Sequence, residues 1–171
     1  MKTNKTNKTN KTKTNKMFSN LKEKDKQLIL FVTKFFVAAA VFLFIWVYVG
    51  VYYQEVVLAL SKPIIFLMGY TGQQVSALNL TNTHLYNFNL VSFLSLAVAT
   101  PLVLRERMKM LVTGLVLMLT VHIIDLVVHF PAYFNNEIAL FILDAVGVIG
   151  LAVPLAVWFF FSYRKVPFLW F

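Results

Sequence analysis

Two things are scarce in this sequence: it contains no cysteine, and charged residues make up only 13% of it. The absence of cysteine excludes disulfides, thiolate metal sites and cysteine nucleophiles. Soluble domains are about 25% charged and at most about half apolar, whereas 59% of this chain is hydrophobic. In water a domain of this size would expose much of that apolar material, whereas a bilayer would solvate it. The composition therefore predicts a single membrane domain.

Acidic residues are also few, and the basic ones are unevenly distributed. Residues 1–26 contain nine Lys and two acidic residues, so they carry +7 of the net charge of +9. Residues 27–171 carry only +2. Because the basic charge is concentrated in a tail, we expect no nucleic-acid partner. The tail instead suits anionic lipid head groups, or it fixes the membrane orientation of the chain.

Residues 1–16 repeat Lys-Thr-Asn and contain no apolar residue after Met1. Such a segment buries too little surface to offset the entropy of ordering, which predicts a disordered tail. Met1 and Met17 are both candidate start residues. Residues 17–27 are predicted to form a short interfacial segment before the membrane domain, which we place at residues 28–165. Residues 166–171 form the C-terminal end.

Long apolar stretches predict an all-α polytopic protein with about four transmembrane helices. The expected spans are residues 28–53, 85–104, 108–130 and 137–163. Residues 56–70 are too short and too interrupted to cross a bilayer as one helix, because Ser61, Lys62 and Pro63 break the apolar run. They are predicted to form an interfacial or re-entrant helix. Residues 71–89 alternate polar and apolar side chains, which predicts a small outer hairpin.

The Lys and Arg residues of the connections predict the orientation of the spans. The tail, the turn at residues 105–109 and the end at residues 164–165 are basic, whereas the connections at 54–84 and 131–136 contain one Lys between them. Positive charge favours the cytoplasmic side. With four spans, both termini are expected in the cytoplasm, and the protein is expected in the cell (inner, cytoplasmic) membrane.

Ionisable residues within the spans are the candidate functional residues, because they are energetically unfavourable there. His122, Asp125 and His129 lie within about a 60° arc of the third span. On the fourth span, Glu137 is expected at the outer boundary and Asp144 about 10 Å deeper, level with His122. The outer start of the second span can reach the same region. The sequence therefore predicts an outward-facing polar pocket whose binding residues are Asn87, Asn89, His122, Asp125, His129, Glu137 and Asp144.

Three interpretations of this pocket are open. The histidines can lock helices together by hydrogen bonds without any chemistry. A divalent metal such as Zn or Fe can be a cofactor, with His122, Asp125 and Asp144 as candidate ligands. His122 and His129 are about 10 Å apart along the helix, so both cannot bind one ion. The third interpretation is catalysis in which a carboxylate orients a histidine, with His122, Asp125 and His84 as candidates.

The order of features over residues 28–165 carries a family resemblance. The second span ends in Ala-Thr-Pro at Pro101, a basic turn follows, and the third span has Gly114 in its middle. An outward polar motif comes next, and the last span ends in basic residues. With this order of features the chain resembles the exosortase/archaeosortase family of membrane peptidases. The resemblance implies an enzyme that acts on tagged surface proteins and uses its own outward-facing Cys, Arg and His.

Aligned by spacing, the three catalytic positions of that family hold other residues here. The Cys position falls close to His84, the Arg position falls on Asp125, and the His position falls near Asn135, Asn136 and Glu137. A thioester intermediate is impossible without cysteine. The resemblance therefore implies an accessory or binding subunit in envelope protein sorting, or in another membrane assembly, with lipid and other membrane or exported proteins as partners. The alternative is a membrane enzyme of altered chemistry, a His/Asp or metal-dependent hydrolase or peptidase.

Overall fold

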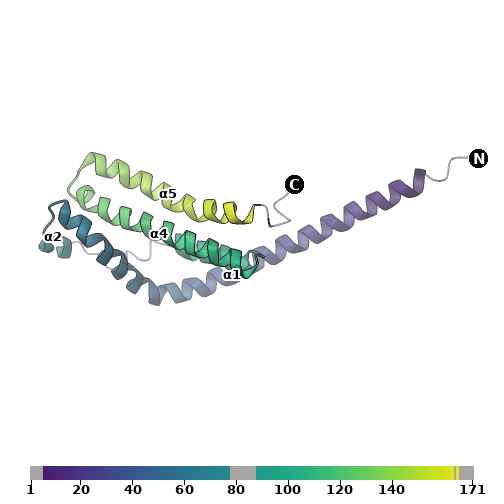
Figure 1. The fold of residues 1–171 in the computed structure, drawn as a ribbon, viewed down its shortest axis with the longest axis horizontal. Helices are drawn as coiled ribbons and strands as arrows, with labels where there is room; N and C mark the ends of the chain where they lie inside the picture. Colours follow the sequence, from purple (N-terminus) through teal and green to yellow (C-terminus); the bar gives the residue numbers. More distant parts are fainter. Residues whose placement is uncertain (1–5, 78–87, 164, 166–171) are drawn as a thin grey trace, which may run out of the picture.

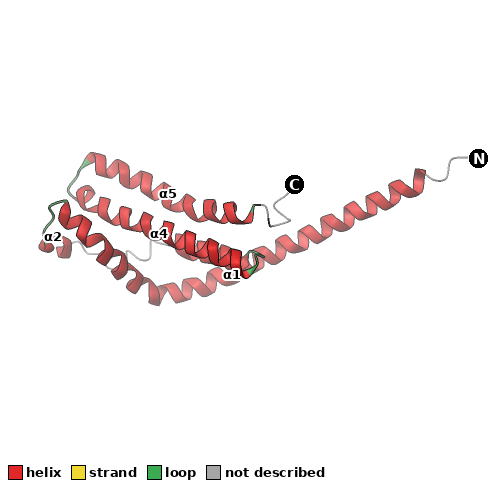
Figure 2. Cartoon of the chain, in the orientation of Figure 1, coloured by secondary structure: helices red, strands yellow, loops and turns green. Residues whose placement is uncertain are grey.

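The computed structural model describes residues 6–77, 88–163 and 165, and the regular elements within them are all helices (Figure 2). They are α1 (Thr6–Leu67), α2 (Gly72–Ala77), α3 (Asn89–Ala99), α4 (Leu104–Tyr133) and α5 (Glu137–Ser162). Three of them are long and apolar enough to cross a membrane: α1 from Glu23 onward, α4 and α5. This is a helical protein suited to insertion in a membrane.

Helices α4 and α5 form an antiparallel pair, and α3 packs against α1, α4 and α5 (Figure 1). The first part of α1 extends beyond this bundle toward the N-terminus, and the helix then bends and runs to α2 at the opposite end. At 1.5 Å per residue, the 62 residues of α1 span about 90 Å, about three times the hydrocarbon thickness of a bilayer. A large part of α1 therefore lies outside the membrane.

The buried side chains form three layers along the bundle. The layer at the end where α4 begins contains Phe93, Ala97, Leu102, Met110 and Val157. The middle layer contains Trp46, Leu90, Val91 and Met118. The layer beside α2 contains Ile65, Val75 and Phe130. We call the end where α4 begins and α5 ends the basic end, because Arg105, Arg107, Lys109 and Lys165 lie there.

Helix α1 differs from the sequence-based prediction at both of its ends. It begins at Thr6, although residues 1–16 are predicted to be disordered and residues 17–27 to be a separate segment. This stretch contains neither Pro nor Gly, so a helix already nucleated in the apolar part can extend into it without a new nucleation step. Residues 1–5 lie outside the described part of the chain.

The segment predicted as a separate re-entrant helix, residues 56–70, belongs to α1 as far as Leu67. Pro63 removes one backbone donor close to the end of the helix and does not terminate it. The helix ends instead at Leu67, just before a turn at Gly69, whose φ is 92°. There the amide of Gly69 donates to the carbonyl of Phe66 and the amide of Tyr70 to that of Ile65. This is a Schellman motif, in which glycine adopts the left-handed conformation without strain.

Residues 72–77 form α2 rather than a strand of the predicted hairpin. The reason is a capping box: the Thr71 hydroxyl accepts from the amide of Gln74, and the Gln74 side chain accepts from the amide of Thr71. This Thr-x-x-Gln pattern satisfies donors at the start of a helix. Val75 then packs on Ile65 and Phe130. Residues 78–87 lie outside the described part of the chain.

The second predicted span, residues 85–104, corresponds in the described part to the 11-residue helix α3. This helix is about 16 Å long, roughly half the thickness of the hydrocarbon. It ends at Ala99 because Pro101 disfavours a helical conformation at Thr100. The Arg107 guanidinium donates to the carbonyls of Thr100 and Leu102, and so pairs backbone acceptors beyond the helix end.

The third and fourth predicted spans, residues 108–130 and 137–163, lie within or nearly within α4 and α5. Helix α4 also includes Pro131, which the sequence places in a turn, and α5 passes through Pro154 without ending. Asn136 caps α5, with its side-chain oxygen accepting from the amide of Ala139. These two helices are the framework against which the candidate residues are placed.

Candidate functional site

Among the residues that the structure describes, the predicted pocket residues lie in separate places, because the buried face of α4 winds around the helix. Its buried positions recur every fourth residue: Met110, Gly114, Met118, His122, Leu126 and Phe130. Each step of four residues advances the buried face by about 40°. His122 lies on this row and is only 4% exposed. Asp125 and His129 lie within about 60° of His122 around the helix. At their own heights, however, the buried row has already turned away from them, so both side chains are more exposed than His122.

His122 is hydrogen-bonded on both ring nitrogens. Its Nδ1 lies 2.7 Å from the Tyr53 hydroxyl on α1, and its Nε2 lies 3.2 Å from Oδ1 of Asn89 at the start of α3. The Asn89 amide nitrogen donates in turn to the carbonyl of Gly150 on α5, at 3.1 Å. One continuous chain of polar groups therefore joins α1, α4, α3 and α5. We call Tyr53, His122, Asn89 and Gly150 the polar lock.

The geometry of the polar lock assigns its protons. Because the Asn89 Nδ2 donates to a carbonyl, which can only accept, the Asn89 Oδ1 faces His122. The Nε2 of His122 must then carry a hydrogen. Burial favours the uncharged imidazole, in which Nδ1 accepts from the Tyr53 hydroxyl. Both ring nitrogens of the imidazole are then paired. A neutral, fully hydrogen-bonded histidine is suited to holding helices together in a bilayer.

Asp125 and His129 form a separate pair on α4. The His129 Nδ1 lies 3.6 Å from the Asp125 carboxylate and 3.1 Å from the Asp125 carbonyl oxygen. Their side chains are 34% and 51% exposed, respectively. An i, i+4 pair of this kind joins two positions on one helix and holds no other element in place.

Asp144 and Glu137 lie on α5, apart from both the polar lock and the Asp125–His129 pair. The buried positions of α5 include Val146 and Gly150, and Asp144 precedes Val146 by two residues, which places it about 200° around the helix. Its side chain is exposed, and within the described residues it makes neither a hydrogen bond nor an ion pair. Glu137 is exposed in the first turn of α5.

The structure therefore divides the predicted pocket residues into groups. It brings together Asn89 and His122, pairs Asp125 with His129, and leaves Glu137 and Asp144 exposed. The proposed metal ligands His122, Asp125 and Asp144 are not gathered, and no cluster of three or more His, Cys, Asp or Glu side chains occurs within the described part of the chain. His84 and Asn87 lie outside the described residues.

Tyr53 is the one side chain of the polar lock that the sequence does not predict, and Gly150 contributes only its backbone carbonyl. It falls among the aromatic residues at the end of the first predicted span, where Tyr and Trp are typical of the membrane interface. The structure places its ring edge-on against His122, with the ring centres 5.6 Å apart. Comparison with protein families, curated proteins and solved structures found no match to this chain. The exosortase resemblance therefore stays a prediction.

Proposed function

We propose that this protein is a non-enzymatic subunit of a membrane assembly, and that it binds a transmembrane helix of its partner through the face of α5 that points away from the bundle. The observation that carries the proposal is the exposed Asp144, which lies about 10 Å from the start of α5 and is the one ionisable residue of that helix beyond its first turn. On insertion scales an ionised Asp near the middle of a membrane costs about 2.5–3.5 kcal/mol. A carboxylate in that position needs a partner, and the described bundle supplies none.

The face of α5 around Asp144 has the spacing of a helix-packing surface. Phe141, Asp144, Val148 and Leu151 follow one another at intervals of three, four and three residues, the pattern of a two-helix seam. The three apolar members are 75%, 69% and 72% exposed. We call these four residues the α5 seam. The small residues Ala145, Gly147 and Ala152 flank it and allow a second helix to approach closely.

The chemistry of Asp144 defines the partner. A Lys or Arg on the facing helix neutralises the carboxylate and donates hydrogen bonds to it, the usual solution for charges within membranes. A parallel second copy packed on the same seam would instead place two carboxylates opposite each other. A partner helix with a basic residue in its outer half is therefore the occupant that fits.

Both ring nitrogens of His122 are engaged in the polar lock, so a role as base or metal ligand requires breaking contacts that join helices. This supports a subunit over the alternative of a membrane enzyme. The exosortase-like order of features suggests envelope protein sorting as the setting. Stoichiometric Zn or Fe in detergent-purified protein, lost in Asp125→Ala, would support the enzyme instead.

In the proposed topology the chain crosses the cytoplasmic membrane four times and both termini are cytoplasmic. The starts of α1 and α4 lie toward the same end of the bundle, since Lys34 and Lys165 line one cavity and Glu106 pairs with Lys165. The position of α3, which leads from Asn89 beside His122 toward that end, supports the proposed crossing between α1 and α4. A reporter fused at residue 107 should be cytoplasmic and one fused after residue 80 external.

Cross-linking in membranes of the native host tests the proposed seam. A photoreactive residue at Val148 should give a defined protein adduct that is lost in Asp144→Asn and kept in Glu55→Gln, which changes an exposed carboxylate on α1. Asp144→Lys should abolish the adduct, and reversing the basic residue of the partner should restore it. The proposal is wrong if Asp144→Asn leaves the adduct intact. It is also wrong if the adduct is a second copy of this chain.

A further inference from the structure

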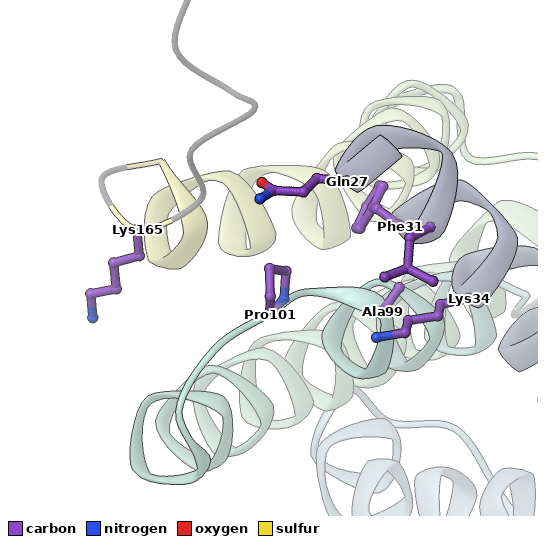
Figure 3. Close-up of a pocket in the computed structure, with 7 residues that line it drawn as sticks. Gln27, Phe31, Lys34, Ala99, Pro101 and Lys165 are labelled. Atoms are coloured by element: carbon purple, nitrogen blue, oxygen red, sulfur yellow. The ribbon is translucent and has the colours of Figure 1, made fainter. Parts of the chain in front are cut away.

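A cavity of about 400 Å³ lies at the basic end, between α1, the end of α3 and the residues after α5. Its volume is within the range of small-molecule sites. Figure 3 shows Gln27, Phe31 and Lys34 of α1 facing Ala99 and Pro101, with Lys165 extending away on the other side of Pro101. Leu30 completes the lining. The cavity combines an apolar wall with two lysines and one amide.

The two lysines of this cavity are in different electrostatic situations. Lys165 lies 2.7 Å from the carboxylate of Glu106, which neutralises its charge. Among the described residues, no carboxylate lies within ion-pairing distance of Lys34. Lys34 therefore presents an uncompensated positive charge beside the apolar side chains of the cavity.

We propose that this cavity binds an anionic phospholipid, with the phosphate on Lys34 and the glycerol backbone and first acyl carbons against Leu30, Phe31 and Pro101. Basic pockets between transmembrane helices commonly recognise acidic lipid head groups in this way. The Gln27 side-chain amide can donate a second hydrogen bond to a phosphate oxygen. The site is distinct from the α5 seam, so a failure of one proposal leaves the other standing.

The contribution of Lys34 is tested by native mass spectrometry of the full chain in detergent, with phosphatidylglycerol and phosphatidylcholine of identical acyl chains as probes. Phosphatidylglycerol should be retained preferentially, and Lys34→Gln should weaken its binding about fivefold, the effect of one basic residue at a membrane surface. Lys62→Gln, which changes another exposed lysine of α1 away from the cavity, should leave binding unchanged. Equal binding by wild type and Lys34→Gln would overturn the proposal.

A second pair of variants separates the cavity from general surface attraction. Leu30 and Val32 are both exposed on α1, but only Leu30 lines the cavity. Leu30→Trp should fill the space and weaken phosphatidylglycerol binding at least as much as Lys34→Gln does, whereas Val32→Trp should not. Unchanged binding in Leu30→Trp would show that Lys34 attracts lipid without a cavity, which contradicts the proposal.

Competition identifies the source of the phosphate. An excess of inorganic phosphate should not displace phosphatidylglycerol, because the acyl chain adds apolar contacts that a free anion lacks. Displacement by inorganic phosphate would show a site for a free anion and would overturn the lipid assignment.

Discussion

His122 and Asp144 are both polar residues in apolar helices, but one is buried and hydrogen-bonded within the bundle and the other is exposed on its surface. His122 is 4% exposed and paired on both ring nitrogens by groups of this chain. Asp144 is exposed and has no partner within the described residues. The same energetic argument, that polar groups in a membrane need partners, assigns the first to the stability of the subunit and the second to association.

The largest expected effect comes from removing the centre of the polar lock. His122→Ala leaves the Tyr53 hydroxyl without its partner, leaves the Asn89 side-chain oxygen with only the amide of Leu90, and opens a cavity. We therefore expect a loss of about 2–4 kcal/mol in unfolding free energy. It is measured by reversible unfolding in detergent micelles. His129→Ala, a half-exposed residue two turns along the same helix, should lose less than about 0.5 kcal/mol. Equal losses would contradict the assignment of His122 to stability.

Two glycines give the next contrast. A methyl group added at Gly114 would overlap the ring of the fully buried Phe93 on α3, whereas one added at Gly147, beside the α5 seam, meets nothing within 4 Å. Gly114→Ala should therefore destabilise the bundle by about 1–3 kcal/mol. Gly147→Ala should be neutral or stabilise it by up to about 1 kcal/mol, because alanine favours helix. The same unfolding experiment measures both.

The outcome for Gly147 also bears on the α5 seam. Gly147→Leu should keep the stability of the isolated subunit while it weakens the cross-link from Val148, since a large side chain keeps a second helix at a distance. A variant that loses both stability and the cross-link would show that this face of α5 already packs within the subunit.

Hydropathy predicts much of this architecture, because α4 and α5 are long apolar runs bounded by basic residues and a turn. Other features depend on single backbone positions. The Thr71–Gln74 capping box is readable in the sequence and replaces the predicted strand, whereas the continuity of α1 through Pro63 depends on how close that residue lies to the helix end. The short α3 is defined by Pro101, which the span prediction passes over.

The candidate site was predictable only in part. The sequence places Asn89 and His122 in one region, and the structure joins them. The sequence-based prediction also groups Asp125 and His129 with His122, and the structure separates them. A helical wheel of α4 alone contains no information about the angle at which neighbouring helices cross it. The buried row winds by about 40° every four residues, which separates these side chains within two turns. Asp144 is exposed for a similar reason, because the position of a residue on α5 alone does not show which face of that helix the neighbouring helices cover.

The smallest expected effect tests whether Tyr53 belongs to the polar lock. Tyr53→Phe removes the hydroxyl that donates to Nδ1 of His122 while it keeps the ring, so the unfolding free energy should fall by about 0.6 kcal/mol, the average for interhelical hydrogen bonds in membranes. Tyr52→Phe changes the adjacent residue, which is 68% exposed, and should have no measurable effect. Nitrogen NMR of His122 supplies a second readout, because its Nδ1 resonance should shift in Tyr53→Phe and stay in place in Tyr52→Phe. If neither readout distinguishes the two variants, α1 is held to α4 by packing alone and the polar lock is confined to α3, α4 and α5.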